Sequence, residues 1–172
     1  SIVTNDYSFI TAMMAHIWSN DNQPTPNNNF LQIDPARCVS LTTNMVTCTR
    51  YNDFTNLVFL SAKKGTTAIF AAPIKGNWNC VETHVRLNDP GMSNGIQEFW
   101  IDGNLEASTT DLNFVGTYTN YGINAILIEN FYNGGSPQAQ VRYMDNFVVS
   151  TQRIGCSPNS ILPAPQNLRI TN

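Results

Sequence analysis

Chemically versatile side chains alternate with apolar ones along two neighbouring stretches of the sequence. Residues 80–87 read CVETHVRL and residues 96–102 read IQEFWID. Strict alternation is typical of β-strands, whose successive side chains point to opposite faces of a sheet. Residues 88–95 between them are rich in Asn, Asp, Pro and Gly, which indicates a hairpin. One face of this hairpin would carry the candidate functional residues: Glu82, His84, Arg86, Glu98 and Trp100.

Carboxylates on adjacent strands are compatible with glycoside hydrolysis. That reaction needs two carboxyl groups about 5–5.5 Å apart for retention, or about 6.5–9.5 Å apart for inversion. Glu82 and Glu98 could supply them. The alternative is structural, because Glu82 with Arg86, or Glu98 with Arg142, would form cross-strand ion pairs worth only a few tenths of a kcal/mol.

Two further functions suit the same face. A polysaccharide lyase must neutralise a uronate carboxylate, remove the adjacent proton and protonate the leaving oxygen, and Arg86 or Arg142, His84 and Tyr132 are the respective candidates. A binding module needs only an aromatic platform, which Trp100 or Tyr132 would provide, with polar groups around it. Of the functions considered, binding places the fewest requirements on these side chains.

Composition limits the class of partner. The chain of 172 residues is long enough for one domain with its own core. Only 12% of the residues are charged and the net charge is -3, whereas Asn fills 23 positions and Thr 17. A surface of this kind hydrogen-bonds neutral polar ligands, and the lack of Lys/Arg clusters argues against nucleic acid. No apolar run is long enough to span a bilayer, so membrane insertion is not expected.

Four cysteines, Cys38, Cys48, Cys80 and Cys156, allow three disulfide pairings, and their spacing does not choose among them. No C-x-x-C or histidine-containing zinc spacing occurs, so disulfides are favoured over metal ligation. Because disulfides persist in oxidising compartments, we expect a secreted or cell-surface protein.

Short strand-like runs separated by turn residues occupy most of the chain: residues 6–18, 30–33, 39–51, 57–62, 66–72, 123–132 and 140–150. Asp34-Pro35 would end the run at 30–33, and residues 104–121 read as irregular. With no long amphipathic helix, this pattern predicts an all-β fold, an antiparallel two-sheet β-sandwich over residues 1–156. Residues 157–172 contain three prolines and are predicted to form an extended tail or linker.

The paired stretches resemble a pattern found in bacterial secreted proteins of the concanavalin A-like lectin/glucanase superfamily. The matching residues are Trp78, Cys80, Glu82, His84, Arg86, Leu87 and Asn88, followed by Phe99-Trp100-Ile101-Asp102-Gly103. The run MDNFVVSTQRIG at residues 144–155 is similar to the ending of the same group. Together these matches cover roughly the second half of the domain.

This resemblance implies a concanavalin A-like jelly roll that holds a sugar chain on the concave face of one sheet. The side chains that would line the groove are Glu82, His84, Arg86, Glu98, Trp100, Asn130, Tyr132 and Arg142. Those that would point into the core are Val81, Val85, Leu87, Phe99 and Ile101. Such sandwiches often carry a structural calcium, and no other cofactor is expected. The E-x-D-x-E signature of the glucanases and the R-x-E-L-R, Q-I-H and Y-x-K-x-G motifs of alginate lyases are absent. Activity therefore has to be argued from the site.

The sequence thus favours a secreted polysaccharide-binding β-sandwich. The alternatives are a polysaccharide lyase that acts on a uronate polymer by β-elimination, and a structural cell-surface or appendage subunit whose partners are proteins. Whether the chain is an enzyme stays open, with a lyase favoured over a glycoside hydrolase.

Overall fold

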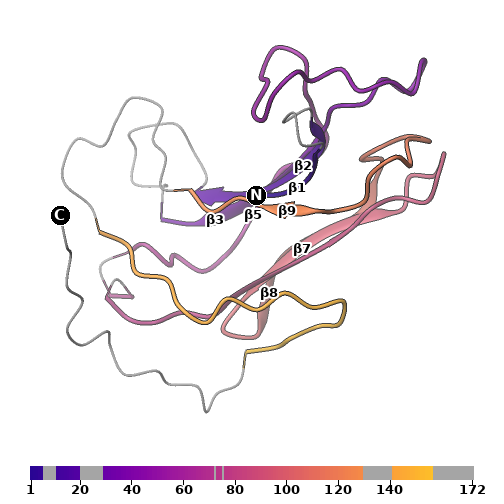
Figure 1. Ribbon diagram of the computed structural model, residues 1–172. Coiled ribbons are helices and arrows are strands. Elements are labelled where there is room, and N and C mark those ends of the chain that lie inside the picture. The colour runs from indigo at the N-terminus through magenta and orange to yellow at the C-terminus, as the bar shows by residue number, and fades with distance from the viewer. Residues whose placement is uncertain (6–10, 20–28, 72, 75, 130–140, 157–172) are drawn as a thin grey trace.

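Two antiparallel sheets make up the protein (Figure 1). The computed structural model describes residues 1–5, 11–19, 29–71, 73–74, 76–129 and 141–156, and this part of the chain contains strands and no helix. Six strands form the larger sheet in the order β4-β3-β2-β1-β9, with β5 also paired to β3, and three form the smaller sheet in the order β6-β7-β8. The predicted all-β, two-sheet fold is confirmed.

The strands of the larger sheet are short except at its centre: β1 (Ile2–Asn5), β2 (Thr11–Ser19), β3 (Leu31–Arg37), β4 (Val58–Phe59), β5 (Lys63–Lys64) and β9 (Ala125–Ile126). The smaller sheet consists of β6 (Val81–Arg86), β7 (Gly95–Ile101) and β8 (Asn104–Leu112). β7 and β8 join through Asp102 and Gly103, both at positive φ, which is the turn geometry that suits the twist of a two-residue hairpin.

Apolar side chains fill the space between the two sheets. Met13 and Ala15 of β2 belong to one cluster with Leu112, Phe114 and Val115. A second cluster joins β3 to β7 and β8: Ile33, Ile69, Phe99, Ile101 and Ala107. The alternation of β2 sends Met14 to the opposite face, where it packs with Val3, Ala36 and the cysteines at 38 and 48. The larger sheet is therefore covered on both faces in this region.

The turn after β5 contacts the smaller sheet closely. A side-chain carbon at Gly65 would lie 2.7 Å from the Phe99 ring, so only glycine fits. Glu106 of β8 accepts the backbone N–H groups of Thr66 and Thr67 at 2.6 and 2.7 Å. Burial alone would raise the pKa of Glu106, but these hydrogen bonds and those of the threonine hydroxyls hold it below its ordinary value. The turn thereby links the two sheets.

Pro35 lies inside β3 rather than at its end, so the predicted stop at Asp34-Pro35 was wrong. Its carbonyl accepts the N–H of Leu60, on the side of β3 where β4 pairs with Ala36–Arg37 and β5 with Gln32–Ile33. Pro35 therefore falls in the interval between two short partner strands. The missing N–H removes no ladder hydrogen bond there, so proline is tolerated.

Other predicted elements were wrong as well. Residues 66–71, predicted to be part of a strand at 66–72, form turns and bends and no strand. Residues 104–112 form β8 although their small polar residues suggested irregular structure, because pairing with β7 overrides a weak strand propensity. Residues 141–150, predicted to be a strand, are exposed and form none. Of the run 123–132, Ala125–Ile126 pair with β1, and residues 130–132 lie outside the described part. The predicted tail at 157–172 also lies outside it.

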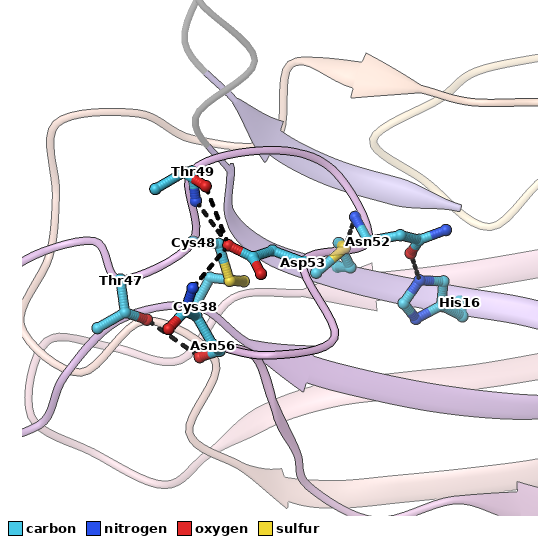
Figure 2. Close-up of a disulfide and its surroundings, with 9 residues drawn as sticks. His16, Cys38, Thr47, Cys48, Thr49, Asn52, Asp53 and Asn56 are labelled. Atoms are coloured by element: carbon cyan, nitrogen blue, oxygen red, sulfur yellow. Dashed lines mark hydrogen bonds between the residues drawn. A yellow bond between two sulfur atoms is a disulfide. The ribbon is translucent and has the colours of Figure 1, made fainter.

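Two disulfides connect the described cysteines, Cys38–Cys48 and Cys80–Cys156. The first closes the base of a loop against the larger sheet (Figure 2). In the segment that follows Cys48, the Asp53 carboxylate accepts hydrogen bonds from the backbone and hydroxyl of Thr49 and from the amide of Asn56. Oxidised pairing was predicted over metal ligation, and the structure has selected one of the three possible pairings. The described residues include no helix long and apolar enough to cross a membrane.

Candidate functional site

Strands β6 and β7 bring the predicted site residues together in register. Glu82 lies opposite Trp100, His84 opposite Glu98, and Arg86 opposite Ile96. Even-numbered residues on paired strands project from one face of a sheet, so the predicted shared face is confirmed.

The odd-numbered residues of these strands mostly face the core, as predicted. Phe99 and Ile101 are buried, and Val85 and Leu87 pack against the inter-sheet cluster. Val81 is the exception, because 44% of it is exposed at the start of the edge strand β6. The prediction that Val81 points into the core was therefore wrong.

A chain of three polar side chains occupies the centre of this face. Nδ1 of His84 lies 3.0 Å from Oε2 of Glu98, and the hydroxyl of Ser108 on β8 donates to Oε1 of Glu98 at 3.0 Å. The side chain of His84 is 46% exposed and that of Glu98 only 19%. A carboxylate at Nδ1 fixes the imidazole tautomer with its proton on that nitrogen, which leaves Nε2 free to exchange a proton.

Two cations border the central chain. The guanidinium of Arg86 donates to the backbone carbonyl of Asn94 at the hairpin turn. On the other side, Nζ of Lys63 donates to the backbone carbonyl of Ser108 at 2.5 Å. Sequence analysis did not single out Lys63, because its approach to β8 depends on contact between the two sheets. The face therefore combines an imidazole and a carboxylate with positive charge on either side.

The end of the face at Glu82 and Trp100 is covered by the segment 153–156. Glu82 accepts the backbone N–H groups of Ile154 at 2.8 Å and Gly155 at 3.2 Å. The guanidinium carbon of Arg153 lies 4.6 Å from the centre of the Trp100 ring, and Trp100 is 8% exposed. The indole expected to form an open sugar platform is thus already stacked, and its ligand-binding role stays a prediction.

The remaining predicted site residues do not join this cluster in the described structure. Arg142 lies over the ring of Phe70, 5.4 Å from its centre. Among the described residues neither of the predicted arginine ion pairs is formed; the partners are His84 for Glu98 and Arg153 for Glu82. Asn130 and Tyr132 lie outside the described residues. Within the described ranges no group of three His, Cys, Asp or Glu residues could hold a metal ion. The suggested structural calcium stays a prediction.

A second polar and aromatic cluster lies on the outer face of the larger sheet, and sequence analysis missed it. His16 stacks on Trp18 with ring centres 4.2 Å apart. Its Nδ1 lies 3.0 Å from the Asp34 carbonyl oxygen, and its Nε2 lies 2.8 Å from Asn52 (Figure 2). His16 is completely buried, so a polymer cannot reach it.

Burial controls the electrostatics of this second cluster. It lowers the pKa of His16, which therefore stays neutral around pH 7. It also raises the pKa of Asp34 to about 6 and that of Tyr51 to about 12. Around pH 7 His16 and Tyr51 are therefore neutral, while Asp34 is mostly ionised. Groups enclosed by their neighbours in this way stabilise a fold rather than bind an extended ligand. The exposed face of the smaller sheet is the better candidate site.

A family model described as Polysaccharide lyase 14 matches residues 43–147, which include all of β6, β7 and β8. The chain belongs to the polysaccharide lyase 14 family. This family is part of the concanavalin A-like superfamily, so the resemblance inferred from the sequence is confirmed. Neither a curated protein nor a solved structure matches the chain.

Membership of the polysaccharide lyase 14 family connects this chain to polysaccharides as its class of ligand. The matched range contains His84, Arg86 and Glu98 and ends before Arg153. The exposed centre of the face thus belongs to the part shared with the family, whereas the covering segment lies beyond it.

Proposed function

We propose that this polysaccharide lyase 14 family member cleaves a uronate-containing polysaccharide by β-elimination on the exposed face of β6, β7 and β8. The observation that carries the proposal is the His84–Glu98 pair, with a 3.0 Å contact on an exposed face and Arg86 two residues along the same strand. An oriented imidazole next to a guanidinium supplies a base and an anion-binding group, which are two of the three groups that the reaction needs.

The proposed reaction assigns one role to each residue. β-Elimination breaks the C5–H and C4–O bonds of a uronate unit and forms a C4=C5 double bond. Arg86 would bind the uronate carboxylate and stabilise the negative charge that develops as the C5 proton leaves. Nε2 of His84 would accept that proton, with Glu98 stabilising the resulting imidazolium. Tyr132 is proposed to protonate the departing C4 oxygen, as expected from the sequence.

Arg86 is preferred to Arg142 as the anion-binding group. Arg86 shares the strand and face of His84, whereas Arg142 is placed over Phe70. A guanidinium has five N–H donors, so the hydrogen bond from Arg86 to the Asn94 carbonyl leaves others for a carboxylate.

Polysaccharide binding without cleavage is the second candidate function. The observation in its favour is the Glu98 carboxylate, which lies beside His84 on the same face. Carboxylates accept hydrogen bonds from sugar hydroxyls and repel an anionic polymer, so they suit a neutral glycan better. For either function we propose an extracellular or cell-surface location, because the chain holds two disulfides.

The two candidate functions can be told apart, because only cleavage gives a product that absorbs in the ultraviolet. Incubation with alginate, polygalacturonate and glucuronan should yield, for at least one polymer, unsaturated ends that absorb in the ultraviolet. His84→Ala should reduce the rate by roughly 100-fold or more, since general acid–base catalysis contributes about that much. Arg50→Ala, which removes an exposed arginine outside this face, is the matched control and should keep wild-type activity.

A thermal melt of each variant would separate loss of chemistry from loss of fold. If wild-type protein binds these polymers but produces no absorbance, the cleavage proposal fails and the binding function remains. Full activity of His84→Ala would contradict the assigned base.

A further inference from the structure

Arg153 lies at one end of the candidate face in a position set by four kinds of contact. Its guanidinium carbon is 4.6 Å from the centre of the Trp100 ring. Its Nε is 3.6 Å from Oε2 of Glu82. The two residues that follow it donate their backbone N–H groups to the same carboxylate, and Cys156 is covalently tied to Cys80 at the start of β6.

These contacts leave the outer part of the guanidinium available. The ion pair with Glu82 uses Nε, and the side chain of Arg153 is 56% exposed while that of Glu82 is 8% exposed. Among the described residues no partner is found for the two terminal nitrogens of Arg153. Those nitrogens are the donors that bind a carboxylate through two parallel hydrogen bonds.

We infer that Arg153 is a specificity-determining residue that binds the carboxylate of a second uronate unit, further along the polymer from the unit being cleaved. The inference rests on the proposed function for its substrate class, and it extends the site beyond the range matched by the family. A guanidinium already stacked on an indole and held at Nε loses little conformational freedom when it binds a ligand. A free surface arginine would lack this advantage.

The position of Arg153 along the face fits an extended polymer. Glu82 and Trp100 are two residues from His84 and Glu98 along their strands, and Arg86 is two residues further on. Each such step is about 7 Å. Arg153 and Arg86 therefore lie on opposite sides of the His84–Glu98 pair, where a polymer that runs along the strands would present carboxylates from different sugar units.

Glu82 has a defined part in this arrangement. It holds the segment 153–155 in place and orients Nε of Arg153, but it is too buried to compete for ligand. Glu82 and Trp100 were predicted to contact the saccharide directly. In the arrangement inferred here they act through Arg153, as positioning residues.

The test compares Arg153→Ala, Arg153→Lys and the control Arg50→Ala on one polyuronate and on the same polymer after its carboxyl groups are reduced to alcohols. Affinity electrophoresis measures binding without any need for cleavage, and kinetics give KM and kcat where cleavage occurs. Arg153→Ala should weaken binding of the polyuronate, and raise its KM, by about 10-fold or more, because a charge-assisted hydrogen-bonding partner is lost. Its kcat should change less than threefold, and binding of the reduced polymer should not change.

Arg153→Lys should fall between wild type and Arg153→Ala, because an ammonium keeps the charge but not the paired geometry. Arg50→Ala should behave as wild type. A sulfated galactan, which carries sulfate esters but no carboxylates, serves as a further arm. If Arg153→Ala affects it more than the polyuronate, the group recognised is a sulfate ester and the inference is overturned.

The outcomes for the two proposals can be distinguished. Binding of polyuronate that depends on Arg153 with no unsaturated product would support this inference and refute the cleavage mechanism. Normal cleavage and unchanged KM in Arg153→Ala would refute this inference and leave the mechanism intact. Equal losses on the native and reduced polymers, or failure of wild type to bind any polyuronate, would also overturn it.

Discussion

The Glu82 carboxylate accepts the backbone N–H groups of Ile154 and Gly155, which are more than seventy positions away in the chain. This contact fixes the segment 153–156 over the edge of the smaller sheet. Without it, two N–H groups would lose their acceptor and Arg153 would lose its ion pair.

Glu82→Ala should therefore destabilise the fold and loosen this segment. Loss of an acceptor for buried or partly buried donors typically costs about 1–3 kcal/mol. Urea unfolding would measure that change, and proteolysis near residue 153 should become faster. Glu82→Gln keeps one carbonyl oxygen, so its free energy of unfolding should lie between those of wild type and Glu82→Ala. Wild-type stability and unchanged proteolysis in Glu82→Ala would show that the segment is held by its disulfide alone.

Glu98→Gln tests the orientation of the imidazole. The amide keeps the shape of the side chain but cannot stabilise an imidazolium as a carboxylate does, so lyase activity should fall by about 10- to 100-fold. Ser108→Ala removes one hydrogen bond to the same carboxylate and should have a smaller effect. The assay is the ultraviolet absorbance of unsaturated ends, with thermal midpoints measured alongside. Equal activity of Glu98→Gln and wild type would leave His84 without the proposed partner.

Much of the smaller sheet could be predicted from the sequence, because strict alternation at 80–87 and 96–102 specifies both the strands and the face of each side chain. The Asp102-Gly103 turn has the geometry of the hairpin between β7 and β8. Even so, residues 104–112 were expected to be irregular, so local pattern was sufficient for β6 and β7 but not for β8.

The parts that could not be predicted depend on long-range contact. Nothing in the local sequence around Arg153 indicates that it stacks on Trp100 or that the following residues cap Glu82. Lys63 reaches Ser108 only because the turn after β5 packs on β8. Burial of His16 depends on the segment after Cys48, which brings Tyr51 and Asn52 against it from more than thirty positions away.

The two disulfides should contribute unequally to stability. In the chain-entropy description, a bridge constrains the unfolded state more when its loop is longer. The separations of 76 residues for Cys80–Cys156 and 10 for Cys38–Cys48 correspond to about 4.5 and about 3 kcal/mol. Replacing each pair by serine and comparing urea unfolding would measure the difference. A larger loss on removal of Cys38–Cys48 would show that packing around that bridge outweighs chain entropy.

Asp53 should protect the protein against acid. Its hydrogen bonds from Asn56 and from Thr49 hold the pKa of the carboxyl at about 2, below its usual 3.8. A depressed pKa adds stability that is present above about pH 4 and is lost as the pH falls toward 2. Asp53→Asn should therefore unfold at a higher pH than wild type, and its stability should change less as the pH falls from about 4 toward 2. Asp111→Asn, at an exposed position of β8, should follow the wild-type curve. Identical acid unfolding of all three proteins would contradict this role.

Asp34 should have the opposite effect on stability. Burial raises its pKa to about 6 from 3.8, so the folded protein retains a proton that the unfolded chain has released. Stability should fall as the pH rises from about 4 to about 6, with a slope of at most about 1.4 kcal/mol per pH unit. His16 opposes this trend, because its lowered pKa makes stability fall as the pH drops below about 6.5. Asp34→Asn keeps an acceptor for the Trp18 indole and removes the first effect, so its free energy of unfolding near pH 7 should exceed that of wild type. Urea unfolding between pH 4 and 7 would measure both curves, and parallel curves would show that Asp34 titrates alike in the folded and unfolded chains.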